Sequence, residues 1–182
     1  VIGNVNGQEL LIKSDLTLQN TRSIVFPERP VTIKRVQGDT LVLLCANGNI
    51  FKSVDDFETY INCPNNLSLL NPIIDFLQVN DSVSLICENA TGTGFMYRSS
   101  DYGANYNVVG GNVGGNKMVM ENDTIYCIKS GGAFVSADFG VSWYVDFYPI
   151  QPNERYNNIY KDSNQIILIG QAQDQGGVLP AN

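Results

Sequence analysis

Three aspartates, each placed two positions after a serine, are the first candidates for chemistry in this sequence: Asp55, Asp101 and Asp138. Paired carboxylates can act as general acid and base, and carboxylate oxygens can ligate calcium. Each of these aspartates, however, stands among turn-forming residues, where a carboxylate accepts backbone N–H groups across the turn. We therefore expect the three carboxylates to stabilise turns.

The most complete copy of the pattern runs from Ser136 to Trp143 and has the form S-x-D-x-G-x-S-W. Gly140 can take a positive φ without steric cost, and Trp143 is large enough to anchor a hairpin. A second copy is similar, whereas the third has Phe57 in place of the glycine, so we expect its turn to differ. We call segments 53–60, 99–106 and 136–143 the Ser–Asp turns. Their predicted structural residues are Ser53, Asp55, Tyr60, Ser99, Asp101, Gly103, Tyr106, Ser136, Asp138, Gly140 and Trp143.

The Ser–Asp turns resemble the Asp box of the bacterial-neuraminidase-repeat family, which occurs in sialidase-like β-propellers. The resemblance implies that each turn joins two strands at the outer edge of a propeller blade, away from the central site. It implies no chemistry for Asp101 or Asp138. Aromatic residues two positions before each serine, and seven after it, are expected to pack within or between blades; they are Phe51, Tyr60, Tyr97, Tyr106, Phe134 and Trp143.

The same resemblance supplies a test for sialidase activity. Sialidases of that family use an arginine cluster, a Tyr–Glu nucleophile pair and an aspartic acid/base, and bidentate arginines suit a substrate carboxylate. This chain lacks the family's N-terminal Arg-Ile-Pro pattern. A sialidase would therefore need its arginines to converge at the centre of the ring; the chain has Arg22, Arg29, Arg35, Arg98 and Arg155.

A second repeat supports a propeller. Turn clusters centred on Asp39, Asp81 and Asp123 follow one another at intervals of 42 residues. A period near forty residues in an all-β chain is typical of propeller blades. We therefore predict an all-β, β-propeller-like array of four-stranded antiparallel blades. Two arrangements stay open: a closed ring of four blades, or a segment of a larger propeller.

Strand-like runs place the blades within a single domain, or part of one, over residues 1–182. Blades are expected at about 30–63, 72–109 and 115–148, with partial blades at 1–26 and 155–182. Residues 1–8 look turn-like, and strands are expected at 9–13, 16–26 and 176–179. The apolar run Leu41–Cys45 is typical of a strand buried on both faces.

Composition excludes several classes of function. The net charge of −7 disfavours nucleic acid, and no apolar run approaches the ~20 residues of a membrane-spanning helix. The chain has no histidine and no C-x-x-C pair, which disfavours His-based catalysis and structural zinc. We expect no cofactor and no metal. Because the chain does not begin with Met, we expect a mature product or a fragment.

The four cysteines allow disulfides, but the repeat argues against them. Cys45, Cys87 and Cys127 lie at offsets of one parity after the repeated aspartates. We therefore expect them on one face of equivalent strands, as buried thiols too far apart for a bridge.

The function expected from the sequence is a non-catalytic binding or structural module of an extracellular, cell-surface or virion assembly. It would recognise a protein or a glycan through loops that break the repeat, at 63–71, 88–94, 110–115 and 146–155. Open blade edges would favour self-association or a larger parent chain. The alternatives are a fragment of a sialidase-like glycoside hydrolase and an assembly factor that docks on another protein.

Overall fold

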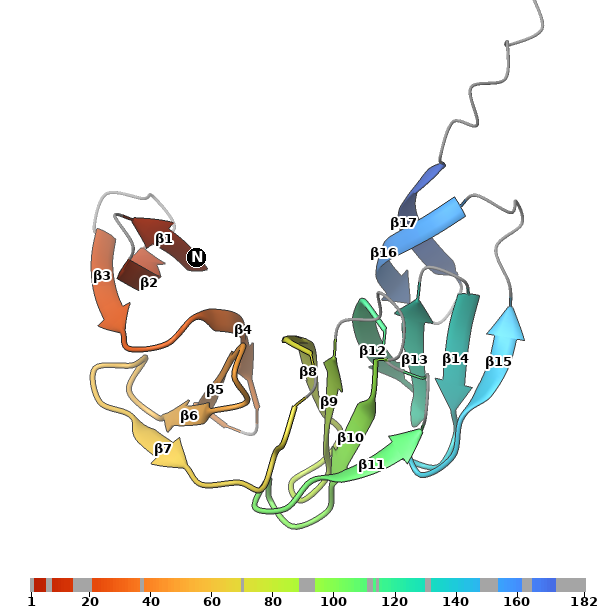
Figure 1. The fold of residues 1–182 in the computed structure, drawn as a ribbon, viewed down its shortest axis with the longest axis horizontal. Coiled ribbons are helices and arrows are strands. Elements are labelled where there is room, and N and C mark those ends of the chain that lie inside the picture. Colours follow the sequence, from red (N-terminus) through yellow and green to blue (C-terminus); the bar gives the residue numbers. More distant parts are fainter. Residues whose placement is uncertain are drawn as a thin grey trace, which may run out of the picture.

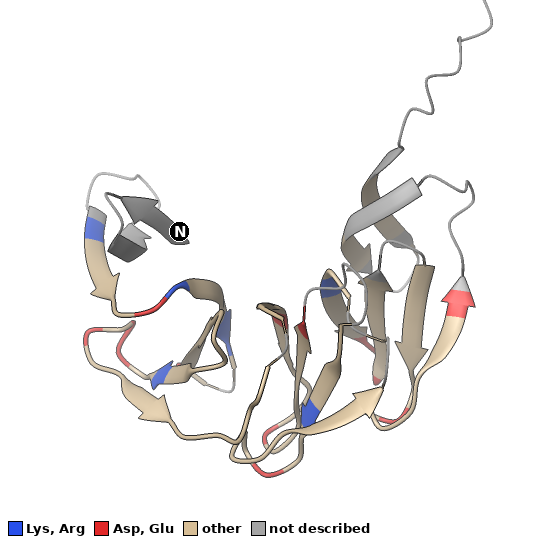
Figure 2. Ribbon diagram, viewed as in Figure 1, with Lys and Arg blue, Asp and Glu red and all other residues tan. Residues whose placement is uncertain are grey.

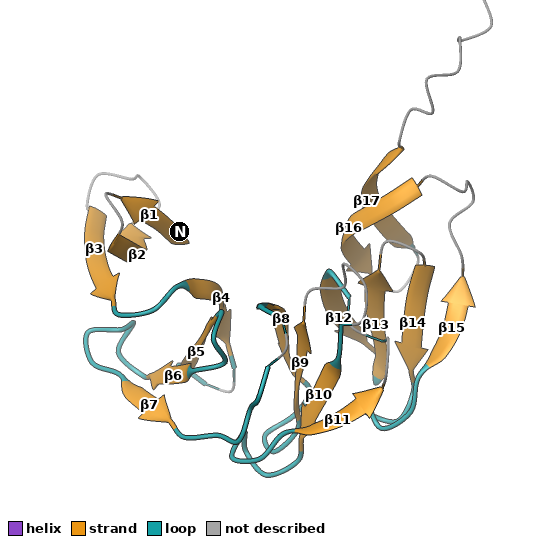
Figure 3. Cartoon of the chain, viewed as in Figure 1, coloured by secondary structure: helices purple, strands orange, loops and turns teal. Residues whose placement is uncertain are grey.

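The computed structural model describes residues 2–5, 8–14, 21–36, 38–69, 71–88, 94–110, 113, 115–129, 132–147, 154–161 and 165–172. These residues contain strands, turns and loops and no helix (Figure 3). All strand pairs are antiparallel. The all-β class predicted from the sequence is confirmed.

Within the described residues the strands form five sheets, three of them four-stranded. The first sheet contains β1 (Ile2–Val5), β2 (Gln8–Ser14) and β3 (Thr21–Phe26). The second contains β4 (Pro30–Arg35), β5 (Leu41–Cys45), β6 (Ile50–Ser53) and β7 (Ile61–Cys63). The third contains β8 (Ile73–Gln78), β9 (Ser84–Glu88), β10 (Met96–Ser99) and β11 (Asn107–Gly110). The fourth contains β12 (Lys117–Glu121), β13 (Thr124–Lys129), β14 (Gly132–Ser136) and β15 (Tyr144–Phe147). The fifth pairs β16 (Glu154–Lys161) with β17 (Ile166–Ala172).

The sheets stand side by side along an arc (Figure 1). Within each four-stranded sheet the strands are paired in chain order, from β4 to β7, β8 to β11 and β12 to β15. The first strands line the inside of the arc, where β4 contacts β8, β8 contacts β12, and β12 contacts β16. The sheets at the two ends of the arc are separate and are not joined into one blade. The described residues therefore form an open arc, and the end strands do not close a ring of four.

Apolar clusters between neighbouring sheets hold the arc together. Leu43 and Phe51 pack with Phe26 of the first sheet, whereas Val42 and Leu44 face the third sheet. Alternate residues of a strand point to opposite faces, so the apolar run of β5 fills both interfaces at once. The prediction of a strand buried on both faces at 41–45 is confirmed.

Some predicted boundaries need correction. Ile2–Val5 forms β1, paired with β2, although its glycine and asparagine had indicated a turn. Residues 16–20 of the strand expected at 16–26, and the whole strand expected at 176–179, lie outside the described residues.

The cysteines do not share one face, and all four are free thiols. Cys45 packs toward the first sheet, whereas Cys87 and Cys127 meet in the cluster between the third and fourth sheets. The prediction of one shared face is wrong because equivalent turns of the second and third sheets, 36–40 and 79–83, are 43 residues apart and not 42. A shift of one residue moves a side chain to the opposite face.

Candidate functional site

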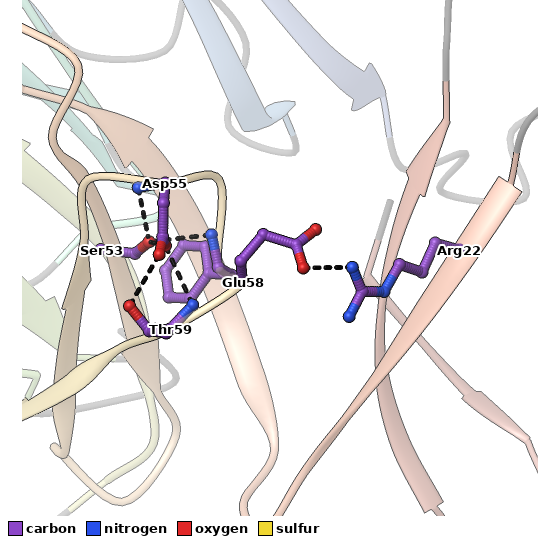
Figure 4. A network of polar contacts seen from close by, with 6 residues as sticks. Arg22, Ser53, Asp55, Glu58 and Thr59 are labelled. Atoms are coloured by element: carbon purple, nitrogen blue, oxygen red, sulfur yellow. Dashed lines mark hydrogen bonds and ion pairs between the residues drawn. The ribbon is translucent and has the colours of Figure 1, made fainter.

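Each Ser–Asp turn is held by one repeated set of hydrogen bonds, which Figure 4 shows for the first turn. The Ser53 hydroxyl donates to Oδ1 of Asp55 at 2.8 Å and accepts the backbone N–H of Phe57 at 2.8 Å. The Asp55 carboxylate also accepts the backbone N–H and the hydroxyl of Thr59, at 2.9 and 2.7 Å. The turns at 99–106 and 136–143 repeat this set. Every acceptor oxygen of these carboxylates is therefore engaged within its own turn.

These hydrogen bonds explain the acidity of the three carboxyl groups. The Thr59 hydroxyl, the Asn105 backbone N–H and the Ser142 hydroxyl make the largest contributions, and the pKa of each aspartate falls to about 2. A carboxylate that accepts several hydrogen bonds favours its charged form. General acid catalysis at neutral pH needs a raised pKa, so these groups are poorly suited to it.

The turn with Phe57 is built like the other two, contrary to the sequence-based expectation. Phe57 takes φ +63°, and Gly103 and Gly140 take +86° and +83°. The Phe57 ring is buried and packs edge-on against Phe26 of the first sheet, with ring centroids 5.8 Å apart. At Gly140 a Cβ atom would lie 2.7 Å from Leu85 of the preceding sheet. The burial of the ring offsets the strain of a left-handed backbone at position 57.

The aromatic residues of the turns lie at different depths. Tyr106 is buried and its hydroxyl is 2.9 Å from that of Ser84. Trp143 is half-buried and its ring N–H donates to the Gly140 carbonyl at 3.2 Å. Tyr60 is exposed on one side while it stacks on Phe26. Of the residues preceding the serines, Phe51 and Tyr97 are buried and Phe134 is half-buried.

Side chains before the serines connect each turn to the next. Lys52 precedes Ser53 and donates from Nζ to the Tyr102 carbonyl at 3.3 Å. Arg98 holds the same place in the next sheet and donates from Nε to the Phe139 carbonyl at 2.9 Å. Tyr102 and Phe139 both take a positive φ. Each contact runs from one sheet to the next, so neighbouring Ser–Asp turns are connected.

The described arginines do not converge on one point. Arg22 on β3 pairs with Glu58 in the first Ser–Asp turn (Figure 4). Arg35 on β4 pairs with Asp39 at 3.1 Å, and Arg98 is engaged on β10. Arg29 is exposed in the loop between β3 and β4, and the side chain of Arg155 lies outside the described part. The arginine cluster that a sialidase requires is therefore not found among the described side chains.

A buried tyrosine–glutamate pair lies between β9 and β10. The Tyr97 hydroxyl donates to Oε1 of Glu88 at 2.8 Å, and Asn71 donates to Oε2 at 3.3 Å. Burial, with the Glu88 carboxylate as a further cause, raises the pKa of Tyr97 well above its usual value. A nucleophile is activated by a lowered pKa or an adjacent base and needs access to substrate. This buried, proton-holding tyrosine has the properties of a structural residue.

A groove with a volume of about 390 Å3 lies between the second and third sheets. Arg35, Val42 and Lys52 line it from the second sheet, and Gln78 and Tyr102 line it from the third. The Tyr102 side chain is largely exposed. The groove thus combines two cations, a carboxylate, amides, aliphatic side chains and an aromatic ring, and arginine and tyrosine are among the residue types enriched at protein interfaces.

A cluster of three charged side chains lies on the inner strands. Asp75 of β8 is fully buried, and its Oδ1 is 3.1 Å from Nζ of Lys117 on β12 and 3.8 Å from Nζ of Lys34 on β4. Its Oδ2 accepts the backbone N–H of Met118 at 2.8 Å. Burial lowers the pKa of Lys34; the Asp75 carboxylate opposes this shift and the Lys117 ammonium adds to it. We call Lys34, Asp75 and Lys117 the inner charge cluster.

Sequence reasoning missed the inner charge cluster. Its three members are separated by 41 and 42 residues, close to the repeat period. Charged residues that recur at that spacing on the first strand of each sheet were the signal that could have revealed it.

The loops expected to bind a partner are not all free. Leu67 and Leu69 pack into the cluster between the second and third sheets, and Asn66 accepts the Tyr106 N–H at 2.6 Å. Residues 89–93 of another expected loop lie outside the described part.

Two kinds of feature are absent from the described part of the chain. No group of three His, Cys, Asp or Glu side chains there is placed to hold a metal ion. That part also contains no helix long and apolar enough to cross a membrane.

Comparison with solved structures gives the fold. YCF48 bound to a D1 peptide matches with a TM-score of 0.63 at 13% identity, over 92% of this chain and 56% of that chain. The N-terminal domain of Nup159 matches with a TM-score of 0.55 at 12% identity, over 90% and 44%. The chain thus spans about half the length of these structures. No family model and no curated protein matches the sequence. The likeness shows that the described sheets are blades of a β-propeller.

Proposed function

We propose that this chain is a non-catalytic β-propeller module that binds a protein partner, and that it holds a segment of that partner in the groove between the second and third sheets. The observation that carries the proposal is the mixed lining of the groove, with the cations of Arg35 and Lys52 beside the exposed ring of Tyr102. Tyrosine and arginine are enriched at protein interfaces. YCF48, which has a similar fold, was solved with a D1 peptide bound, and this supports a peptide as the ligand.

The rest of the described molecule favours binding over catalysis. The three turn aspartates are engaged in their own turns and strongly acidic. The arginines are dispersed, and Tyr97 is buried with a raised pKa. A catalytic site needs accessible groups that converge on a substrate with suitable pKa values. These observations support the binding module over the glycosidase fragment.

A selection from a displayed random peptide library tests the proposal, followed by affinity measurements on the selected peptides. Tyr102→Ala and Arg35→Ala should each weaken peptide binding at least tenfold, because each removes a side chain that lines the groove and would contact the peptide. Tyr144→Ala is the matched control, since Tyr144 is an exposed tyrosine on β15 outside the groove. If the selected peptides bind both groove variants with the affinity of the parent chain, the groove is not the binding site. Turnover of a fluorogenic sialoside by the chain would refute the non-catalytic assignment, and retention on a glycan array without peptide binding would favour a glycan.

We also propose that the Ser–Asp turns are Asp boxes and that the blades belong to one domain. The repeated hydrogen bonds of the three turns support the first proposal. For location, we propose an extracellular, cell-surface or virion assembly. The sequence contains four N-glycosylation sequons, at Asn66, Asn80, Asn89 and Asn122. The side chains of Asn66, Asn80 and Asn122 are exposed. Mass spectrometry of the native material would test this location through its glycans, if the source is eukaryotic, and through the proteins that copurify with it.

A further inference from the structure

The inner charge cluster holds more positive than negative charge. Lys34 and Lys117 reach the same oxygen of Asp75 from strands on either side of it, β4 and β12. Both of these strands carry blue segments in Figure 2, where Lys and Arg are blue. Only Lys117 is close enough for a hydrogen bond; Lys34, at 3.8 Å, is an ion pair alone. The other oxygen of Asp75 is occupied by the Met118 N–H. One carboxylate therefore serves two ammonium groups.

The excess positive charge faces solvent. Asp75 is fully buried, whereas the side chains of Lys34 and Lys117 are 34% and 31% exposed. An ammonium has three donors, and Asp75 Oδ1 can engage at most one donor of each lysine. Two like charges this close repel each other, more strongly at a partly buried site than in water. A second anion would relieve that repulsion and accept the remaining donors.

We infer that Lys34 and Lys117 form a binding site for a small oxyanion, a carboxylate or a phosphate group, on the inner strands of the arc. The lysines come from two different sheets and Asp75 from the sheet between them, so the site exists only when three blades are packed together. The buried Asp75 carboxylate attracts both ammonium groups and so holds the two sets of N–H donors close to each other. The inference does not depend on the groove proposed above, which lies around other residues.

The test is a titration of the whole chain with sodium phosphate and, separately, sodium acetate, at constant ionic strength with chloride. Two-dimensional NMR of the lysine Cε–Hε groups should show saturable shifts at Lys34 and Lys117. Lys34→Met and Lys117→Met should each weaken the anion affinity at least tenfold. Arg29→Met is the control and should leave the affinity unchanged, because Arg29 is an exposed cation in the loop between β3 and β4 and belongs neither to the cluster nor to the groove.

Asp75→Asn gives a result that a purely structural cluster does not predict. It removes the only carboxylate paired with the two lysines among the described residues, so phosphate should bind at least threefold more tightly although the fold is less stable. If this variant does not fold, the anion affinities of the two lysine variants decide whether the cluster binds the anion. Saturation by phosphate alone would identify a phosphate site, and saturation by both salts a general oxyanion site. Shifts that fail to saturate, or that persist in both lysine variants, would overturn the inference.

Discussion

At the scale of single residues, the Ser–Asp turns replace missing backbone hydrogen bonds with side-chain bonds. A tight hairpin leaves several N–H groups without a strand partner, and buried groups of this kind are costly. The serine hydroxyl accepts the Gly140 or Gly103 N–H and donates to the aspartate, so that one hydroxyl serves two partners. The aspartate then engages the end of the turn.

The acidity of the turn aspartates predicts a dependence of stability on pH. The folded-state pKa of each is about 2, below the usual 3.8. A depressed pKa stabilises the fold fully above about pH 4, and this contribution is lost as the pH falls toward the folded-state value. Melting temperatures measured by calorimetry from pH 5 to pH 2 should fall more steeply for the parent chain than for the triple variant Asp55→Asn, Asp101→Asn, Asp138→Asn. Parallel curves would contradict this origin of the acidity.

Position 140 requires glycine for two reasons: its backbone φ is positive, and a Cβ atom there would collide with a neighbouring side chain. Gly140→Ala should destabilise the protein by roughly 1–3 kcal/mol, because φ is +83° and the new Cβ would lie 2.7 Å from Leu85. Gly38→Ala is the control: it has a similar backbone, with φ +62°, but nothing lies within 4 Å of its Cβ position. Urea unfolding should show the larger loss for Gly140→Ala. Equal losses would mean that only the backbone conformation matters.

At the scale of elements, one turn geometry accommodates different neighbours. In the first turn the Phe57 ring fills the space toward the preceding sheet. In the third turn Leu85 of the preceding sheet fills that space, and a glycine is needed. The interface is therefore filled from either side, as close packing demands.

Phe57 should contribute more to stability than Trp143, although tryptophan is larger. Phe57 is buried among Phe26, Phe51 and Tyr60, so Phe57→Ala should cost roughly 3–5 kcal/mol. Trp143 is only half-buried, so Trp143→Ala should cost less than the 3–5 kcal/mol expected for a fully buried ring. Chemical denaturation of both variants measures the difference. A larger loss for Trp143→Ala would show that its packing exceeds what its exposure indicates.

The contacts between successive turns should be measurable. Arg98→Met keeps much of the aliphatic stem but removes the hydrogen bond to the Phe139 carbonyl. The expected loss is about 0.5–1.5 kcal/mol, the usual range for one hydrogen bond. Arg29→Met is the control, because Arg29 is an exposed arginine in a loop between sheets. If both variants have the parent's denaturation midpoint, the contact contributes no stability.

At the scale of the whole molecule, each sheet depends on its neighbours. The contacts between inner strands run in sequence from β4 to β8, β12 and β16. Such quasi-one-dimensional arrays gain stability from nearest-neighbour interfaces. Asp75 crosses two of these interfaces at once, since it contacts lysines of the sheets on both sides.

A disturbance at one interface should therefore stay partly local. A Cβ at Gly115 would collide with Cys127 Sγ and the Ile128 carbonyl, so Gly115→Ala should loosen the fourth sheet. Hydrogen exchange should show reduced protection in β12–β15 and near-parental protection in β4–β7, because local unfolding follows the local contacts. A uniform loss across all sheets would show that the array unfolds as one cooperative unit.

The sequence by itself determined most of the strands, the repeat and the positions of the turns. Alternating and continuous apolar runs report burial directly, and a serine–aspartate pair forms its bonds within eight residues, so β5 and the turn at 136–143 could be predicted locally. Tertiary structure decided the rest. Whether Cys87 faces one sheet or the other depends on a one-residue difference between turns, and the burial of Phe57 at φ +63° depends on its packing against Phe26 of another sheet. The inner charge cluster joins three sheets, so its geometry follows from how the blades pack, which no local pattern specifies.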